Sequence, residues 1–277
     1  MARLTYTPEA QAYYDAYKLM MQDPDRFSRT AEDKIRSLVF AITDSTCPLY
    51  CHIERGILPS VSDVAELFGD GASVIRDAIF RLSGTLGLLA ASGSPIKLRP
   101  AIPKEEEFRS INDMRKRLEV EALIQVHCIA DPRDKRRAVE ILSHANLHIG
   151  SVLELTASYD EKEICERVAV DPVFGEWADD FWRYDRRFHL AAAAATDMKL
   201  HCDMLHILLE RIRLSGSNRA TIIRRIPSSF EQHRSIIEAV KAKESTSSAA
   251  KILEAVTEHF DSSNEDFGYE KRESKFA

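Results

Sequence analysis

Glycine and proline are both scarce in this sequence, with 10 of each in 277 residues. Collagen-like and low-complexity chains contain far more of both, so the composition excludes these classes. Hydrophobic residues make up 44% of the chain, which also excludes a wholly disordered protein. No apolar run approaches the roughly 20 residues that cross a bilayer, and the start lacks the basic-then-apolar order of a signal peptide. We therefore expect a mainly α-helical, cytoplasmic protein with no membrane partner.

Cysteine is also sparse, with five residues scattered along the chain. This odd number is typical of a reducing compartment, so we expect free thiols rather than disulfides. Cys47, Cys51 and His52 lie close together but lack the paired C-x-x-C spacing of a structural zinc site, which favours small buried or loop thiols. The formal net charge of −6 gives no broad attraction for nucleic acid. Any DNA binding therefore has to come from a local patch.

The order of predicted elements indicates two domains, as the length also suggests. Residues 1–29 form an N-terminal extension with a helix over 8–22. Within residues 30–102, helices over 31–42, 61–69 and 72–84 precede two short apolar runs, which is the order of a winged helix-turn-helix. Residues 103–267 are predicted to form an antiparallel helical bundle and 268–277 a flexible tail. We expect breaks in the bundle at Asp131-Pro132, Tyr159-Asp160, Asp171-Pro172, Ser215-Gly216 and Pro227.

Asp185 and His189 form the sharpest candidate site. They stand four residues apart, so one helical turn places both side chains on the same face. Their stripe is otherwise apolar, with Ala178, Trp182 and Ala192. Because a lone buried carboxylate is costly, the pattern predicts a partner that compensates its charge.

His233 and His259 repeat this pattern on two later helices, each in a stripe of apolar residues. A single inward histidine is more often a hydrogen-bonded core residue than a metal ligand. Three of them with one carboxylate favour a metal site, and nitrogen with oxygen ligands suits Zn²⁺, Ni²⁺, Mn²⁺ or Fe²⁺ better than Ca²⁺. The remaining histidine pairs, His144 with His148 and His201 with His206, have no carboxylate on the same stripe and are interpreted as surface or packing residues.

Three motifs of the bundle resemble those of the GntR family of transcription regulators that carry an FCD ligand domain. The family pattern is Asp-x-x-Phe-His, then Glu-x-His-x-x-Ile, then a histidine in the last helix; the sequence has Asp185–His189, Glu231–Ile236 and Glu258-His259. The opening helix also matches, with Arg115 followed four residues later by Glu119. The combination of motifs is specific to the family, whereas any one motif alone would be weak evidence for the resemblance. Residues 158–177 and 241–248 are longer than the family pattern, and the first of these could cover the pocket or contact a second subunit.

The resemblance implies that Asp185, His189, His233 and His259 bind one divalent transition metal. It also implies that a small carboxylate effector completes the coordination of that metal. Open positions on a five- or six-coordinate metal would accept a carboxylate oxygen. Arg115 or Arg213 could hold the other end of the effector, although either arginine could equally lie on a solvated helix face.

The predicted DNA-binding residues are Ser73, Arg76, Arg81, Gly93 and Lys97. Arg76 matches the DNA-contacting arginine of the family, and Gly93 lies in the turn of the predicted wing. The family has further basic residues where this chain has Ser62 and Ala72. Residues 30–100 hold seven Lys or Arg against eight Asp or Glu, a net charge of −1, so we expect weaker duplex binding than is typical.

The resulting hypothesis is a homodimeric transcription regulator that binds double-stranded operator DNA and senses a small organic acid, most simply as a repressor. Two alternatives stay open at this point. A site with three histidines, one carboxylate and open positions could activate water in a hydrolytic enzyme, although the sequence has no nucleophile motif such as G-x-S-x-G. A sensor that has lost DNA binding is the other alternative, because the winged domain has so little positive charge.

Overall fold

The chain divides into two compact units. A computed structural model describes residues 7–23, 30–44, 47–49, 57–84, 87, 89–92, 97–213, 218–242 and 245–266. The first unit comprises Met1–Ile102, Tyr159–Asp179 and Gly216–Ala220, and the second comprises Pro103–Ser158, Asp180–Ser215 and Thr221–Ala277. The first unit thus takes in two short segments from the later part of the chain as well as the predicted winged domain.

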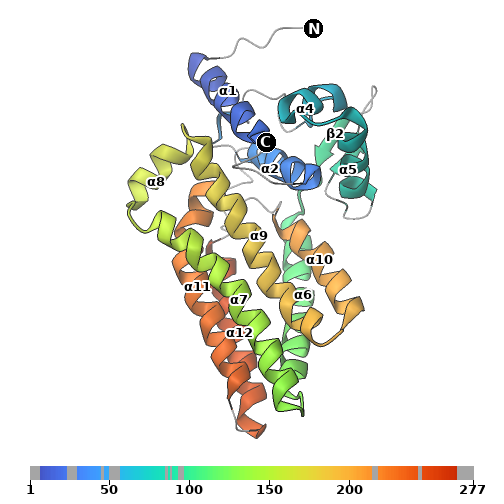
Figure 1. Ribbon diagram of the computed structural model, residues 1–277, viewed down its shortest axis with the longest axis vertical. Coiled ribbons are helices and arrows are strands. Elements are labelled where there is room, and N and C mark those ends of the chain that lie inside the picture. The colour runs from blue at the N-terminus through green and yellow to red at the C-terminus, as the bar shows by residue number, and fades with distance from the viewer. Residues whose placement is uncertain are drawn as a thin grey trace. The chain divides into compact units, whose positions relative to one another are not determined.

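The first unit has the predicted order of helices followed by a hairpin (Figure 1). Its elements are α1 (Pro8–Gln22), α2 (Ala31–Thr43), α4 (Val61–Phe68), α5 (Ala72–Gly84), β1 (Leu89–Ser92), β2 (Lys97–Pro100) and α8 (Glu161–Val168). The two strands are antiparallel, with Leu89 opposite Pro100 and Ser92 opposite Lys97. Three helices and a two-stranded hairpin are the elements of a winged helix-turn-helix.

Local sequence signals determine where these helices begin and end. Thr30 and Ser60 are N-caps whose side chains accept hydrogen bonds from the backbone N–H groups of Asp33 and Asp63. Helix α4 ends at Gly69, which has a φ of +68° in the left-handed region that favours glycine. These signals explain why the boundaries could be predicted from the sequence.

The N-terminal extension packs against the helix-turn-helix within the first unit. Tyr13, Tyr17 and Met21 of α1 are buried. At the surface, Lys18 Nζ lies 2.9 Å from the carboxylate of Glu66 on α4, and Gln22 donates to the Glu66 carbonyl at 2.8 Å. Helix α1 therefore contacts and stabilises α4, the first helix of the predicted DNA-binding motif.

A buried guanidinium joins the later segments of the first unit to α2. The Arg219 side chain is only 1% exposed, and its Nη2 lies 3.5 Å from Asp179 Oδ2 and 3.4 Å from the Ser37 carbonyl oxygen. Asp44 accepts a hydrogen bond of 2.9 Å from the Arg219 backbone N–H. The Asp179 carboxylate also accepts a 2.5 Å hydrogen bond from Ser37 Oγ. These buried charges compensate each other, so the removal of any one of them should destabilise the protein.

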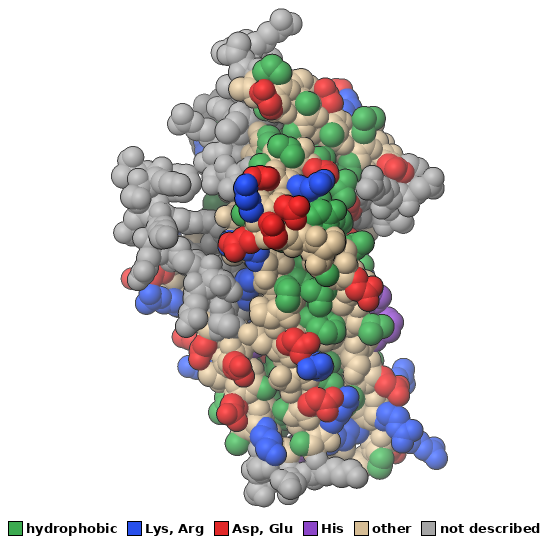
Figure 2. All heavy atoms as spheres, turned by 90° about the vertical axis from the view of Figure 1, so that its left-hand side faces the viewer, with side chains coloured by type: hydrophobic (Ala, Val, Ile, Leu, Met, Phe, Trp, Pro, Cys, Tyr) green, Lys and Arg blue, Asp and Glu red, His purple; other side chains and the backbone are tan. Residues whose placement is uncertain are grey.

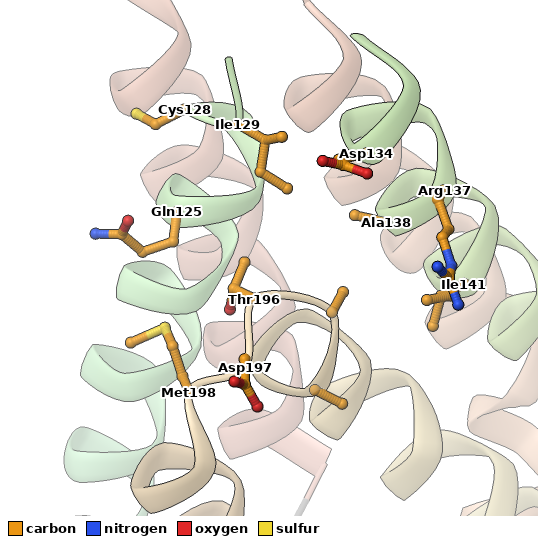
Figure 3. Close-up of a pocket in the computed structure, with 12 residues that line it drawn as sticks. Gln125, Cys128, Ile129, Asp134, Arg137, Ala138, Ile141, Thr196, Asp197 and Met198 are labelled. Atoms are coloured by element: carbon orange, nitrogen blue, oxygen red, sulfur yellow. The ribbon is translucent and has the colours of Figure 1, made fainter. Parts of the chain in front are cut away.

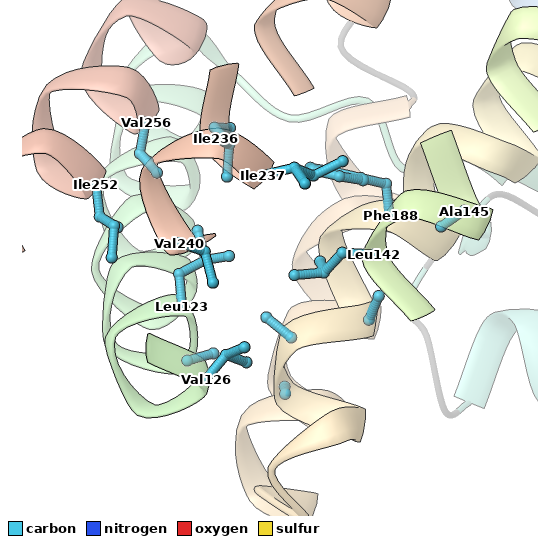
Figure 4. Close-up of a cluster of buried hydrophobic side chains, with 14 of the residues drawn as sticks. Leu123, Val126, Leu142, Ala145, Phe188, Ile236, Ile237, Val240, Ile252 and Val256 are labelled. Atoms are coloured by element: carbon cyan, nitrogen blue, oxygen red, sulfur yellow. The ribbon is translucent and has the colours of Figure 1, made fainter. Parts of the chain in front are cut away.

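The second unit is a helical bundle with one continuous hydrophobic core (Figure 4). Its helices are α6 (Glu105–His127), α7 (Pro132–Thr156), α10 (Lys199–Arg213), α12 (Ser245–Asp266) and most of α9 (Pro172–Ala195) and α11 (Arg219–Lys241). Side chains from five helices meet in this core: Leu123, Val126, Leu142, Ala145, Phe188, Ile236, Ile237, Val240, Ile252 and Val256. Each buried large aliphatic side chain contributes about 1.5–3 kcal/mol.

Three of the expected helix breaks are present, and one is wrong. Asp131, Asp160 and Asp171 precede α7, α8 and α9, and Asp160 forms a capping box with Glu163. Pro227 instead lies inside α11. The Pro227 side chain is exposed, and apolar residues buried on both sides hold the helix together. Ser215-Gly216 and the 268–277 tail lie outside the described residues, and no described helix is long and apolar enough to cross a membrane.

We expect Arg219→Met to destabilise the protein strongly, because it removes the guanidinium that is ion-paired with the buried Asp179 carboxylate. Removing one partner of a buried ion pair typically costs about 3–5 kcal/mol. Arg81→Ala is the matched control, since it breaks an ion pair with Glu32 whose arginine side chain is 69% exposed, and it should cost at most about 1 kcal/mol. Urea denaturation followed by circular dichroism measures both changes; equal losses would contradict a stabilising role for the buried pair.

Candidate metal centre

Three histidines from three helices converge inside the second unit. His189 lies on α9, His233 on α11 and His259 on α12, and all three are buried. Their ring centroids are 5.0–5.1 Å apart. One nitrogen of each ring lies within 4.8 Å of the corresponding nitrogens of the other two. This spacing allows one ion to reach all three.

Asp185 faces the same space from one turn before His189. Its Oδ2 lies 3.5 Å from His189 Nε2, and its Oδ1 lies 3.6 Å from His233 Nε2. The carboxylate is buried like the imidazoles. The structure thus brings the three predicted histidines together, with Asp185 beside two of them.

The unpaired nitrogens of this cluster fit a metal better than they fit a hydrogen-bonded core. Among the described residues, neither His233 nitrogen has a hydrogen-bond partner, and neither does His189 Nε2. Buried polar atoms without partners are unfavourable by about 1–3 kcal/mol each. His259 Nδ1 lies 3.0 Å from Gln232 Oε1, so a protonated Nδ1 would leave the lone pair of this ring on Nε2. His189 Nε2 and one nitrogen of the neutral His233 ring are therefore available as ligands.

The electrostatics of the cluster favour the metal-binding protonation states of Asp185, His233 and His259, but not of His189. Burial holds the pKa of His233 and of His259 well below the usual histidine value, so both rings are neutral. Burial acts to raise the pKa of Asp185, but His189 and then His233 hold it well below its usual value. For His189, burial and Arg115 act to lower the pKa, yet Glu119 and Asp185 raise it overall. An ionised carboxylate beside two neutral imidazoles suits a divalent transition metal, and a bound metal would take the place of the second proton on His189.

A fourth helix, α6, contributes a residue to which the sequence analysis gave no role. Glu119 Oε2 lies 2.8 Å from His189 Nδ1, and Arg115 Nε donates to Glu119 Oε1 at 2.6 Å. Both side chains are buried. The signal was present as the four-residue spacing of Arg115 and Glu119, but spacing alone did not show that the carboxylate faces a histidine of another helix.

The two predicted effector arginines have different surroundings. The Arg115 guanidinium lies 4.7 Å from the centroid of the Phe260 ring, and its Nη2 has no hydrogen-bond partner among the described residues. Arg213 is the last residue of α10 and is half-buried. The geometry therefore supports Arg115 as an effector contact, and the role of Arg213 stays a prediction.

Three other histidines of the second unit have ordinary surface or packing environments, whereas His206 Nε2 lies 3.6 Å from Glu210 Oε1, a carboxylate one turn along α10 that the sequence analysis overlooked. His148 stacks on Tyr184 with ring centroids 5.0 Å apart, and His144 lies edge-on to His148. His201 Nε2 lies 3.1 Å from Glu121, whose side chain is 58% exposed. In the first unit, Cys47 is buried and free, while Cys51 and His52 of the alternative zinc cluster lie outside the described residues.

Figure 3 shows a separate pocket of about 620 Å³ at the end of the bundle, between the end of α6, the start of α7 and the turn that joins α9 to α10. Ile129, Ile141 and Met198 form part of its wall, with polar groups such as Asp134 and Arg137. None of the four candidate metal ligands lines this pocket. It is therefore not the metal centre.

The predicted DNA-binding residues lie on two elements of the first unit. Ser73 and Arg76 are exposed on α5, the second helix of the helix-turn-helix. Arg81 on the same helix is paired with Glu32 at 3.1 Å, which reduces its availability for phosphate. Lys97 is the first residue of β2, and Gly93 lies outside the described residues. Figure 2 shows acidic and basic side chains intermingled over the face that it presents.

Comparisons with known proteins agree with this architecture. The family model described as the FCD domain matches residues 110–262. A solved structure titled "E. coli McbR/YncC" is 17% identical with a TM-score of 0.54, and the match covers 86% of this chain and 96% of that one. A Listeria monocytogenes structure, whose title states that Lar controls the expression of the agr system, is 10% identical with a TM-score of 0.51, covering 87% and 98%.

A third structure, a transcriptional regulator of the GntR family from Pseudomonas syringae, is 17% identical and covers 98% of both chains, but its TM-score of 0.34 carries no argument. No curated protein sequence matches the chain. The FCD match spans the segment that holds Arg115, Glu119 and the four candidate ligands. The first two solved structures support the fold alone, because both identities are low.

We expect His233→Leu to abolish metal binding without destabilising the metal-free protein. In EDTA its free energy of unfolding should match that of the wild type or exceed it by about 1–3 kcal/mol, because two buried unpaired nitrogens are removed. Elemental analysis and thermal unfolding with Zn²⁺ measure the loss of metal. His201→Leu, at a side chain that is 21% exposed, is the control and should keep the zinc response; equal metal in both variants would contradict the site.

Proposed function

Because the chain belongs to the FCD domain family, we propose that it is a ligand-responsive transcription regulator whose effector binds at a divalent metal in the second unit. The observation that carries this proposal is the convergence of three buried imidazoles and one carboxylate, with both nitrogens of His233 unpartnered among the described residues. Such a set is unfavourable inside a bundle unless an ion compensates it.

Asp185, His189, His233 and His259 would hold the metal. Nitrogen and oxygen donors of this kind suit Zn²⁺, Ni²⁺, Mn²⁺ or Fe²⁺. When bound, a metal of this class offers open coordination positions to a further oxygen ligand. The stacking of Phe188 on His233, with centroids 3.7 Å apart, holds one ligand ring in place from the apolar side.

A small organic acid is the effector that fits these groups. One carboxylate oxygen would occupy an open position on the metal, and Arg115 Nη2 would donate to a second acceptor on the same molecule. A buried cation beside a divalent ion attracts an anion strongly, since little water screens the charges there. Arg213 remains a second candidate for this contact.

The first unit would bind operator DNA through α5 and the hairpin. Ser73 and Arg76 are exposed on α5 in the position of a recognition helix, and Lys97 begins the second strand of the wing. A homodimer would bring two such units to two half-sites related by its two-fold axis. The net charge of −1 over residues 30–100 supports modest rather than tight duplex binding.

The geometry of the site does not favour the alternative of a hydrolytic metal enzyme. Beyond the candidate ligands, Glu119 is a carboxylate close to the site, and it is held by both Arg115 and His189. A general base has to be able to accept a proton from the reacting group, and an ion-paired, hydrogen-bonded carboxylate is poorly suited to that role.

We expect Arg76→Ala to weaken DNA binding by about 5- to 150-fold, since a side chain that reads a base edge is typically worth about 1–3 kcal/mol. Arg81→Ala is the matched control on the same helix, and its pairing with Glu32 predicts a change below about threefold. Gel shifts at low salt with the DNA upstream of the protein's own gene measure both. Failure of the wild type to shift any fragment would support the DNA-free sensor instead.

We also expect a small carboxylic acid to change operator affinity by about 5- to 150-fold, the usual range for coupling between effector and operator. The effect should require metal, because the acid binds partly through it. Titrating a panel of short carboxylates into the protein–DNA complex, with and without prior EDTA treatment, tests this. A response that persists without metal would contradict the proposed effector site.

A further inference from the structure

The side of the cluster that faces α6 is organised by a chain of buried polar contacts. Arg115 Nε donates to Glu119 Oε1 at 2.6 Å, and Glu119 Oε2 lies 2.8 Å from His189 Nδ1. The side chains of all three residues are at most 6% exposed. His189 Nε2, on the other side of the ring, has no hydrogen-bond partner among the described residues and faces Asp185 at 3.5 Å.

This arrangement determines which nitrogen of His189 can bind an ion. A neutral imidazole carries one proton, and the nitrogen that donates it cannot also offer a lone pair. The ionised Glu119 carboxylate, 2.8 Å away, accepts a hydrogen bond from Nδ1–H. In the neutral ring the lone pair therefore lies on Nε2, which points into the cluster. Hydrogen bonding of this kind also makes the ring a stronger electron donor.

We propose that Glu119 is a positioning residue of the metal centre, which fixes the tautomer and orientation of His189, and that Arg115 holds Glu119 in place for this purpose. The proposal rests on the proposed metal site but concerns residues that do not touch the ion. It gives Arg115 a second role, since its Nε serves Glu119 while its Nη2 remains for the effector.

The alternative is that Glu119 is itself a ligand or only a packing residue. Against the first, both oxygens of Glu119 are engaged with Arg115 and with His189 Nδ1, whereas Asp185 faces Nε2 of His189 and of His233. Against the second, burying a carboxylate only to fill space would be unfavourable in free energy. The position of Glu119 between a guanidinium and a histidine matches the carboxylate–histidine pairs that orient metal ligands in proteins.

The chain offers a matched control on the same helix. Glu121 Oε2 lies 3.1 Å from His201 Nε2, so this pair is also a carboxylate beside an imidazole. Its glutamate side chain is 58% exposed, and His201 is not part of the cluster. Glu121→Gln therefore removes the same charge from the same helix without touching the metal centre.

The test measures Zn²⁺ affinity in Glu119→Gln, Glu119→Ala and Glu121→Gln by competition with a chelator, without DNA or effector. Loss of an orienting partner typically costs about 10- to 100-fold in metal affinity. We expect about a tenfold loss for Glu119→Gln, whose amide oxygen can still accept from Nδ1, about a hundredfold loss for Glu119→Ala, and less than a twofold change for Glu121→Gln. Circular dichroism in EDTA identifies any variant that fails to fold. If Glu119→Ala fails to fold, the Zn²⁺ affinity of the isosteric Glu119→Gln variant tests the proposal.

Two spectroscopic readouts separate positioning from packing and from direct ligation. Long-range ¹H–¹⁵N spectra of the metal-free protein, at a pH where the His189 ring is neutral, should show it protonated at Nδ1 in the wild type and lose that pattern in Glu119→Ala. The absorption bands of the Co²⁺-substituted protein should keep their positions in Glu119→Gln, because the ligand set is unchanged. Wild-type affinity in both Glu119 variants, an unchanged tautomer or a shifted cobalt spectrum would overturn this role alone, whereas a wild type that binds no Zn²⁺ would overturn the metal site as well.

Discussion

The burial of three imidazoles and a carboxylate is the constraint on which the second unit depends. Without compensation, these groups would oppose folding, because each loses hydration and two of the rings have nitrogens with no hydrogen-bond partner among the described residues. An ion at their centre would reverse this balance, so that metal binding becomes part of the stability of the bundle. The apolar core beside them, from Leu123 to Val256, then stabilises the helices that carry the ligands.

The same helices extend beyond the metal centre. The candidate ligands His189 and His233 lie in parts of α9 and α11 that belong to the second unit, whereas Pro172–Asp179 and Arg219-Ala220 belong to the first. The segment over residues 158–177, which the sequence analysis interpreted as longer than the family pattern, forms all of α8 and the start of α9. Its residues contribute to the buried network around Arg219, in which a side chain at Gly175 would lie 3.1 Å from Arg219 Nε. The insertion therefore has a packing role within the first unit.

Much of the architecture was predictable because its signals are local. Helix α1 has the predicted bounds, and α2 and α4 agree with theirs to within one residue, since caps such as Thr30, Ser60 and Gly69 act within one turn. Pro227 was misread because the rule for proline considers only the local backbone, whereas the outcome also depends on burial to either side of that position. The extra residues before α12 did not displace His259 from the cluster, since its ring lies 5.0 Å from that of His233.

The sequence by itself determined the helical class, the order of elements and the identity of the four candidate ligands, because spacing along one helix decides which side chains share a face. Only the tertiary structure decided how different helices meet. It set Glu119 against His189, 70 residues away, tied Arg81 to Glu32, and buried Arg219 among residues from α2 and α9. These pairings depend on packing between distant segments, and no periodicity within a single helix specifies them.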